Sequence, residues 1–382
     1  MISLFCITLL AFTLSVAFCL GFRGLAREWY LIDIPDARKR HDGNVPLCGG
    51  IAVFLSFFVA AFLTPSLAGS ANAIALLPGL FLILVTGVMD DRFNLPVAPR
   101  LAMQLIAAFL IIGVAGITQV HLGLVTGITQ GTPLPATEIT GAILEGPLFL
   151  LIALAFVVGL VNAVNMSDGV DGLAGSASAA AFFWLAAICF WIDENRLGLQ
   201  TIALSAACTG FLFFNMRHRW RAKASLFLGD GGSTFLGATL SGIILMLTNA
   251  HAAVAFPIVL WVVVVPVIDT LSLIVRRLSA RRSPFSPDRQ HLHHLLIDAG
   301  LSHGQTAIAV MALNFLAGAI AYLAIRMEIP AWPMLIALII PVIAHTLFVL
   351  HTNRGLRPIV AAPAGEPAQT SKANVTLPGA TS

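Results

Sequence analysis

Three acidic clusters lie at the ends of long apolar runs, where a carboxylate is costly to keep. They are the pair Asp90 and Asp91, the pair Asp168 and Asp171, and Asp230. Ionised groups beside hydrocarbon are rarely kept unless they pair, bind a cation or take part in chemistry. If the clusters open to the same side of a bilayer, they can converge on one metal ion and one phosphorylated substrate. We therefore predict phosphoryl chemistry at that side.

The residues beside these acids carry the oxygen atoms that Mg²⁺ prefers. Asn162, Asn165 and Asp168 are three residues apart, so on a helix they share one face. Glycines flank Asp230, and glycine allows close backbone approach to a ligand. Mg²⁺ is usually held by one or two protein groups plus substrate phosphates. The pattern favours a magnesium site, with a polar interhelical turn and a metal-free anion site as alternatives.

The pair Asp90 and Asp91 is followed by Arg92 and Arg100. Adjacent carboxylates repel, so a nearby cation is needed to keep both ionised. The alternative to a catalytic role is a helix end whose acids pair with the two arginines.

A histidine-rich segment contains Arg289, His291, His293 and His294. Its histidines lack a carboxylate or cysteine at zinc-ligand spacing, and the neighbouring arginines would repel a cation. Phosphate recognition or proton transfer therefore suits the segment better than zinc binding or a purely structural role. Four of the histidines that lie elsewhere in the chain are expected to have no role in the site: His121, His251, His345 and His351.

Two further charged features are open to interpretation. The segment 33–41 includes Arg38 and His41, and it is either a solvated loop or a substrate contact. Asp269 lies within an apolar run, and we interpret it as the buried partner of a nearby cation rather than a catalytic group.

The composition predicts an all-α, polytopic membrane protein. The chain has 382 residues, of which 58% are apolar and 10% are charged, whereas about a quarter of a soluble protein is charged. About eleven runs are long enough to cross a bilayer as helices. They span 3–22, 48–67, 73–89, 100–117, 146–164, 173–192, 199–215, 232–248, 252–275, 304–326 and 330–351.

The distribution of basic residues orients these helices. Alternating loops place every one of the 21 basic residues except Arg196 and Arg326 on one side, which the positive-inside rule identifies as cytoplasmic. The N-terminus is then outside, the C-terminus is cytoplasmic, and the acidic clusters all lie at the cytoplasmic face. We expect a membrane domain over 1–352 and a disordered tail over 353–382, which is rich in Ala, Pro, Gly, Ser and Thr.

Four motifs occur in order along the chain. They are Asp-Asp-Arg-Phe at 90–93, Asn-Ala-Val-Asn-Met-Ser-Asp-Gly-Val-Asp-Gly at 162–172, Phe-Leu-Gly-Asp-Gly-Gly-Ser at 227–233 and Arg-Gln-His-Leu-His-His at 289–294. Together they resemble the polyprenyl-phosphate N-acetylhexosamine-1-phosphate transferases, over most of the membrane domain. The loop at 33–41 and the segment at 283–289 look like the bacterial undecaprenyl-phosphate GlcNAc-1-phosphate transferase branch.

The resemblance implies that UDP-GlcNAc and undecaprenyl phosphate give undecaprenyl-diphosphate-GlcNAc and UMP. It implies Mg²⁺ as cofactor, with Mn²⁺ as a candidate substitute. It places the enzyme in the bacterial inner membrane, among membrane lipids, at the first membrane step of O-antigen or related polysaccharide synthesis. Nucleic acid is not an expected partner, and a homodimer is compatible with the family.

The resemblance also assigns roles to the motif residues. Asn165 and Asp230 would hold the metal. Asp90, supported by Asp91, would act as base or orient the phosphate, and Arg100 would neutralise the diphosphate. Around the uridine it places Asp168, Asp171 and Phe227. At the sugar phosphate or the lipid phosphate it places Arg289, His291, His293 and His294. Further substrate contacts are Asn162, Arg38 and His41, and Asp168 and His291 also count as catalytic residues.

Two kinds of alternative remain open at this level. Within the superfamily, the sugar can be another N-acetylated one, such as a fucosamine or quinovosamine derivative, and a covalent aspartyl-phosphate intermediate is compatible with the same residues. In a different class, intramembrane acids also mark ion-coupled transporters. Transporter acids tend to lie near the bilayer midplane, often in a repeated architecture, whereas here they gather at one face and no repeat is evident.

Overall fold

The computed structural model describes residues 2–34, 43–64, 71–123, 141–219, 221–283 and 290–355. Within these ranges, ten helical segments are long and apolar enough to cross a membrane. The predicted span over 48–67 contains a shorter apolar helix, Gly49–Leu63. The all-α, polytopic fold is therefore confirmed. The predicted tail lies outside the described residues from 356 onward.

Helices make up most of the described chain, and two small antiparallel hairpins accompany them. The helices are α1 (Ile2–Glu28), α2 (Gly49–Leu63), η1 (Ala73–Leu76), α3 (Leu77–Phe93), α4 (Val97–Val114), α5 (Gly146–Ser167), α6 (Leu173–Trp191), α7 (Asn195–Asn215), α8 (Gly229–Ala250), α9 (Phe256–Val259), η2 (Leu260–Val263), α10 (Val264–Ser279), α11 (Leu292–Asp298), α12 (His303–Arg326), α13 (Ala331–Ala337) and α14 (Ile339–Gly355). The hairpins pair β1 (Ile32–Asp33) with β2 (Val45–Pro46), and β3 (Gln119–Gly123) with β4 (Ala142–Glu145).

Local sequence signals mark several helix ends. Proline stands in the first turn of α3 and α5, where its missing N–H would have no intrahelical partner anyway. Ser302 and Gln305 form a capping box at the start of α12. Asn94 ends α3 in the left-handed conformation, with a φ of 50°, which asparagine tolerates better than most residues.

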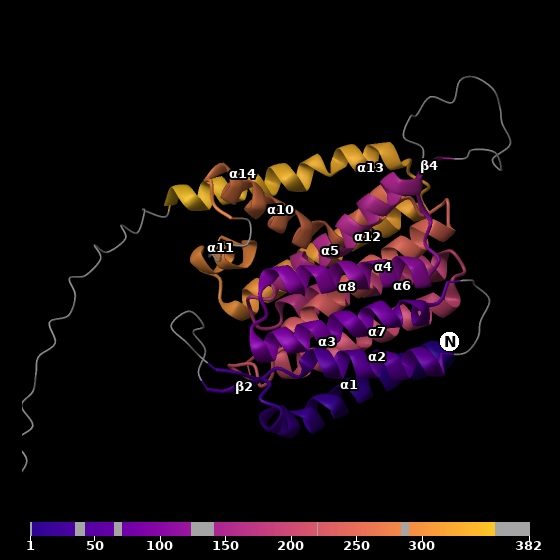
Figure 1. Cartoon of the computed structure of the whole chain (residues 1–382). Helices are drawn as coiled ribbons and strands as arrows, with labels where there is room; N and C mark the ends of the chain where they lie inside the picture. Colours follow the sequence, from indigo (N-terminus) through magenta and orange to yellow (C-terminus); the bar gives the residue numbers. More distant parts are fainter. Residues whose placement is uncertain are drawn as a thin grey trace, which may run out of the picture.

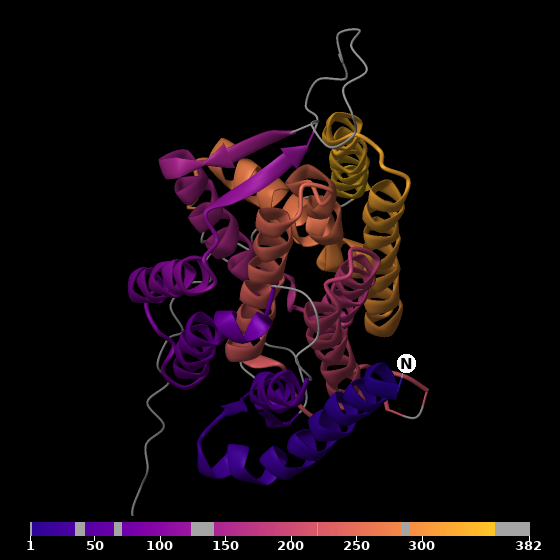
Figure 2. The same cartoon turned by 90° about the vertical axis from the view of Figure 1, so that its right-hand side faces the viewer.

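Helix α8 lies at the centre of the bundle. The 18-residue window that marks it as a candidate span is entirely buried, and the helix packs against α2, α3, α5 and α6. Figure 2 shows these neighbours around it. Close packing requires small residues at the start of α8: a Cβ atom on Gly87 of α3 would lie 2.6 Å from the Gly231 nitrogen, and one on Gly50 of α2 would overlap Gly232. Asp230 is therefore carried by the best-enclosed helix.

The predicted span 252–275 is a broken element made of α9, η2 and α10. Pro266 lies in the first turn of α10, where it can start a helix but cannot continue the hydrogen bonding of a preceding one. After the break, α10 packs against α5, α12 and α14. Asp269 lies three residues after Pro266, so the direction of α10 determines which helices it can reach.

The helix ends that carry the motifs lie at one end of the bundle. In Figure 1, α11 and β2 lie at the left end, and the N-terminus and β4 lie at the right end. The chain crosses between these ends along each long helix, so the ends of α3, α5 and α7 and the starts of α4, α8 and α12 fall on the left. The predicted convergence of the acidic clusters depends on this arrangement.

Candidate active site

Asp90 is buried at the last turn of α3, and its carboxylate has polar partners on both oxygens. Arg100 Nη1 lies 2.5 Å from Asp90 Oδ2, and the Leu95 N–H donates to Asp90 Oδ1 at 2.8 Å. Arg100 comes from the first turn of α4, across a tight turn that Asn94 begins. The pairing of Asp90 with Arg100 that the helix-end alternative predicts is therefore observed, as an ion pair that leaves Arg100 partly exposed.

Asp91 points toward a different element. Its Oδ1 accepts from the Asp230 N–H at 2.8 Å, and its Oδ2 accepts from the Gly231 N–H at 3.1 Å. These are backbone groups at the start of α8, which have no acceptor within their own helix. A carboxylate there also interacts favourably with the positive end of the helix dipole. In the structure Asp91 thus holds the start of α8 and fixes the backbone position of Asp230. Its catalytic role stays a prediction.

The Asn165 amide connects α5 to the acidic start of α8. Its Nδ2 donates to Asp230 Oδ1 at 2.7 Å and contacts Ser233 Oγ at 2.9 Å. Both contacts use the nitrogen, so the carbonyl oxygen can still serve as a ligand. The two residues that the sequence assigns to a metal therefore meet directly.

Asn162, one turn earlier on α5, faces another way. Its Nδ2 donates to Gln104 Oε1 of α4 at 2.7 Å and to the Val158 carbonyl at 2.8 Å. Gln104 is buried, and nothing in its local sequence marked it as a site residue. Only the packing of α4 on α5 reveals it.

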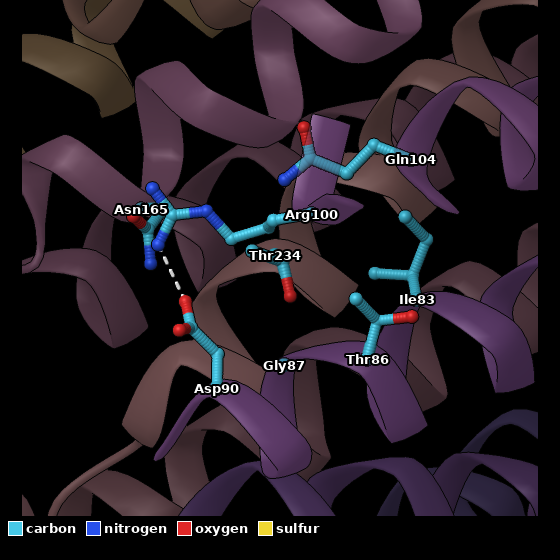
Figure 3. A pocket seen from close by; sticks show the side chains of 8 residues that line it. All are labelled: Ile83, Thr86, Gly87, Asp90, Arg100, Gln104, Asn165 and Thr234. Atoms are coloured by element: carbon cyan, nitrogen blue, oxygen red, sulfur yellow. Dashed lines mark hydrogen bonds and ion pairs between the residues drawn. The ribbon is translucent and has the colours of Figure 1, made fainter. Parts of the chain in front are cut away.

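A small pocket joins these groups. Figure 3 shows its lining, with Arg100 reaching between Asp90 and Asn165. Ile83 and Thr86 of α3 also line it. The full lining is Ile83, Thr86, Gly87, Asp90, Arg100, Gln104, Asn165 and Thr234. The lining thus combines the charged Asp90 and Arg100 with residues of a membrane-length helix, a combination that suits a ligand with an ionic head and an apolar chain.

Asp168 follows the end of α5 and lies within electrostatic reach of Asp230 and Asp171. Burial, followed by repulsion from those two carboxylates, raises the pKa of Asp168 to about 7. Near neutral pH this carboxyl group therefore loses its proton readily when a cation arrives. The carboxylate of Asp168 thus lies close enough to those of Asp171 and Asp230 to be repelled by them, and a bound cation would relieve that repulsion.

Asp171 connects the turn between α5 and α6 to the segment that precedes α8. Its Oδ2 accepts from Arg217 Nε at 2.6 Å and from the Ala224 N–H at 3.3 Å. Phe227 belongs to the same segment and is half-buried. Its backbone N–H donates to the Pro46 carbonyl at 2.8 Å, and its carbonyl accepts from the Gly49 N–H at 2.9 Å. The side chain is thus held beside the start of α2.

The three histidines of the α11 segment stack beside the acidic turn. His291 and His293 are buried, with ring centroids 5.5 Å apart and an angle of 5° between the ring planes. The centroids of His293 and His294 are 4.2 Å apart. A Cβ atom on Gly169 would lie 2.8 Å from His293 Cε1, so this ring packs on the residue after Asp168. The histidine segment therefore lies directly beside the turn that carries Asp168.

Three predicted site residues, Arg38, His41 and Arg289, lie outside the described residues. The structure corrects the interpretation of two histidines taken as incidental. His251 Nε2 lies 2.8 Å from Glu194 Oε1, and His345 Nε2 lies 3.3 Å from Asp269 Oδ1. Both carboxylates are buried. Sequence spacing could not reveal these pairs because their members come from distant helices.

The side chains around Asp230 determine which metal ion the site could hold. Among the described residues, no group of three or more His, Cys, Asp and Glu side chains is arranged to hold an ion, so these residues form no closed protein cage. The Asp230 carboxylate and the Asn165 amide, with Asp168 nearby, match an open site completed by water and phosphate oxygens, which is the usual coordination of Mg²⁺. The residues present therefore fit Mg²⁺ and do not fit structural zinc.

Comparison with known proteins gives a family match. The model of glycosyl transferase family 4 matches residues 73–248. The chain is similar to the undecaprenyl-phosphate alpha-N-acetylglucosaminyl 1-phosphate transferase of Yersinia pestis, with 32% identity over 85% of each chain. The protein of the same name from Escherichia coli K12 is 30% identical, again over 85% of each chain. A relative from Bacillus subtilis, described as a probable undecaprenyl-phosphate N-acetylglucosaminyl 1-phosphate transferase, is 30% identical over 75% of each chain.

Proposed function

Because the chain belongs to glycosyl transferase family 4 and is a phosphotransferase, we propose that it transfers GlcNAc-1-phosphate from UDP-GlcNAc to undecaprenyl phosphate. The products are undecaprenyl-diphosphate-GlcNAc and UMP. We place this reaction at the cytoplasmic face of the bacterial inner membrane, as the first membrane step of a cell-surface polysaccharide. There, a lipid that stays in the membrane meets a nucleotide sugar from the cytoplasm.

The meeting of Asp90, Arg100, Asn165 and Asp230 carries this proposal. Figure 3 shows three of these residues around one pocket whose wall continues along α3, and Asn165 contacts Asp230 directly. Phosphoryl transfer depends mainly on positioning and charge neutralisation. The lipid phosphate can enter beside α3 and α4, and the diphosphate can approach from the aqueous end of the bundle.

In the proposed reaction, an oxygen of the lipid phosphate attacks the phosphorus that bears the sugar. The bond from that phosphorus to the bridging oxygen breaks, and UMP leaves with that oxygen. Arg100 places positive charge in the lining of the pocket, and its pairing with Asp90 holds it there. Asp90 orients the incoming phosphate through Arg100. Lipid phosphate is largely ionised near neutral pH, so orientation matters more than deprotonation.

We propose Asn165 and Asp230 as the protein ligands of Mg²⁺, with Asp168 adding negative charge nearby. When bound, Mg²⁺ would neutralise charge on the diphosphate during transfer. Asp91 serves the same site indirectly, because its two hydrogen bonds hold the backbone of Asp230 and Gly231. The start of α8 is thereby fixed before any substrate arrives.

The function is tested with purified protein in nanodiscs supplied with undecaprenyl phosphate, Mg²⁺ and a panel of UDP-sugars. We expect UMP release and a lipid diphosphate carrying GlcNAc, both identified by mass spectrometry. If the enzyme prefers a fucosamine or quinovosamine derivative, the proposed reaction type stands and the proposed sugar is wrong. Ion transport without UMP release would replace the proposal with the transporter alternative.

Mg²⁺ binding is expected to stabilise the protein more at pH 8 than at pH 6. The raised pKa of Asp168, about 7, lies above that of an unfolded aspartate, about 3.9. Without metal, the stability contribution of this group therefore falls as the pH rises from about 4 to about 7, because the folded state holds the proton longer. Above pH 7 the ionised group favours a bound cation.

The measurement is the shift in melting temperature on adding MgCl₂, with Asp168→Asn as the comparison variant. The variant should lose most of the difference between pH 6 and pH 8. An unchanged difference would mean that another group controls the binding of Mg²⁺.

Phe227→Ala is expected to raise the KM for the nucleotide sugar by about 10-fold, because stacking of a base on an aromatic ring contributes about 1–3 kcal/mol. The KM for undecaprenyl phosphate should change little. Phe62→Ala is the matched control, since Phe62 is 56% exposed near the end of α2, whereas Phe227 contacts Gly49 at its start. A change confined to the lipid KM would contradict the assignment of Phe227 to the uridine.

A further inference from the structure

Asp269 is a buried carboxylate that the proposed chemistry does not use directly. It lies on α10 with only 3% of its surface exposed. An ionised group in such a place must be fully hydrogen-bonded, or its desolvation is very costly. The structure supplies three donors, from His291, Leu292 and His345. The carboxylate is therefore a junction between α10, the histidine segment and α14.

The three donors divide unequally between the two oxygens. Asp269 Oδ2 lies 2.9 Å from His291 Nδ1. Asp269 Oδ1 accepts from the Leu292 N–H at 2.8 Å and lies 3.3 Å from His345 Nε2. A carboxylate has no proton to offer when ionised, so each ring nitrogen that faces it must carry one. His291 is thus held as the form protonated on Nδ1.

This arrangement leaves the other nitrogen of His291, Nε2, on the side of the ring away from Asp269. The ring is also fixed by its near-parallel stacking on His293, which itself packs against Gly169 beside Asp168. The tautomer of His291 is therefore set by Asp269, which lies outside the four motifs. The orientation of the ring is set by Asp269 together with the neighbouring His293. A histidine whose second nitrogen donates to a carboxylate is pre-positioned for use of its first.

His345 brings the last membrane helix into this contact. It lies on α14, 76 residues beyond Asp269, and α14 packs on both α10 and α11. Its Nδ1 is buried and has no hydrogen-bond partner among the described residues. Within the described part of the chain, the ring is therefore held by its Nε2 contact with Asp269.

We propose that Asp269 and His345 are positioning residues that hold His291 in its Nδ1-protonated form, facing the phosphate groups. The proposal rests on the proposed function for its kinetic consequences. The contact itself is independent of substrate, so it can be tested in the resting protein.

Asp269→Asn tests the positioning directly. The amide oxygen should stay on the side that accepts from Leu292 and His345, which turns the NH₂ group toward His291 Nδ1. The neutral His291 ring must then carry its proton on Nε2. We expect kcat to fall about 10- to 100-fold, the range seen when a partner that orients a ligand is removed. The KM values for both substrates should change by less than about threefold.

The tautomer is read by ¹⁵N NMR of histidine-labelled protein in nanodiscs, with the His291 signals assigned by their absence in His291→Gln. Wild type should show a protonated Nδ1, and Asp269→Asn a protonated Nε2. The same tautomer in both proteins would overturn the proposal. If wild type transfers no sugar phosphate at all, the proposed function fails, and the NMR result still decides the positioning contact.

His345 is tested with two variants. His345→Phe keeps a ring but removes the donor, and kcat should fall by about 10-fold. His345→Gln keeps a nitrogen donor near the position of Nε2 and should restore most of the rate. Equal losses in both variants would assign His345 to packing of α14 alone.

Glu194→Gln is the matched control, because Glu194 is another buried carboxylate paired with a histidine, His251, at 2.8 Å. It lies at the turn between α6 and α7, at the other end of these helices from the motifs. This variant should lower thermal stability without changing kcat or the His291 tautomer. A loss of kcat equal to that of Asp269→Asn would indicate a general effect of removing buried charge.

Discussion

Asp230→Asn is expected to lower turnover by about 10³-fold or more, the size of effect produced by removing one strong electrostatic group from an active site. The substitution keeps the shape of the side chain, and the new amide oxygen can still accept from Asn165 Nδ2, which lies 2.7 Å from Asp230 Oδ1. The charge is lost, and one of the two acceptor oxygens becomes an NH₂ donor. Turnover is measured as UMP release in nanodiscs, and folding as the melting temperature.

The control for this variant is Asp193→Asn, the same chemical change at the opposite end of the bundle. Asp193 has a φ of 61°, a conformation that asparagine also adopts, so the control should keep both its fold and its activity. Turnover of Asp230→Asn close to that of wild type would remove this residue from the metal site. A matching loss in the control would point to a general sensitivity of the protein.

Gly87→Ala is expected to impair both folding and catalysis. The added methyl group would lie 2.6 Å from the Gly231 nitrogen and 2.7 Å from the Asp230 carbonyl carbon, and backbone atoms cannot move aside as a flexible side chain can. Overpacking of this kind costs about 1–3 kcal/mol of stability. Since the displaced atoms belong to Asp230 and its neighbour, we also expect a loss of about 10²-fold in kcat, as a small misplacement of reacting groups produces.

Thermal unfolding and UMP release test this variant together. Gly159→Ala on α5 is the control, because a Cβ atom there would meet nothing within 4 Å and alanine favours the helix. The control should be as active as wild type and equally or more stable. Full activity of Gly87→Ala would show that the start of α8 can shift without consequence for the site.

The apolar pattern predicted the membrane fold correctly because a backbone in lipid must satisfy its hydrogen bonds internally. Long runs without charge must form helices, and ten long apolar segments and the shorter α2 occur where eleven were predicted. The helix breaks were less predictable. The division into α9, η2 and α10 falls beside Pro266, whose missing backbone N–H interrupts the helix hydrogen bonds, and a hydropathy pattern does not register it.

The acidic motifs were also recognisable, because a carboxylate near hydrocarbon is costly and so stands out. What each one contacts was not recognisable. Asp90 and Asp91 are neighbours in sequence, yet one pairs with Arg100 of α4 and the other holds the backbone of α8. Adjacent residues on a helix point about 100° apart, so their partners depend on which helices pack on each side.

The residue types, their order and the helix ends they occupy thus followed from the chain alone, since they reflect the local energetics of charge and hydrocarbon. The contacts of Gln104, Asp269 and His345 followed only from helix packing. Each joins elements far apart in sequence, as in the 76-residue separation between Asp269 and His345. Such pairings arise when helices settle side by side and a buried polar group takes the nearest partner, and no local pattern encodes that choice.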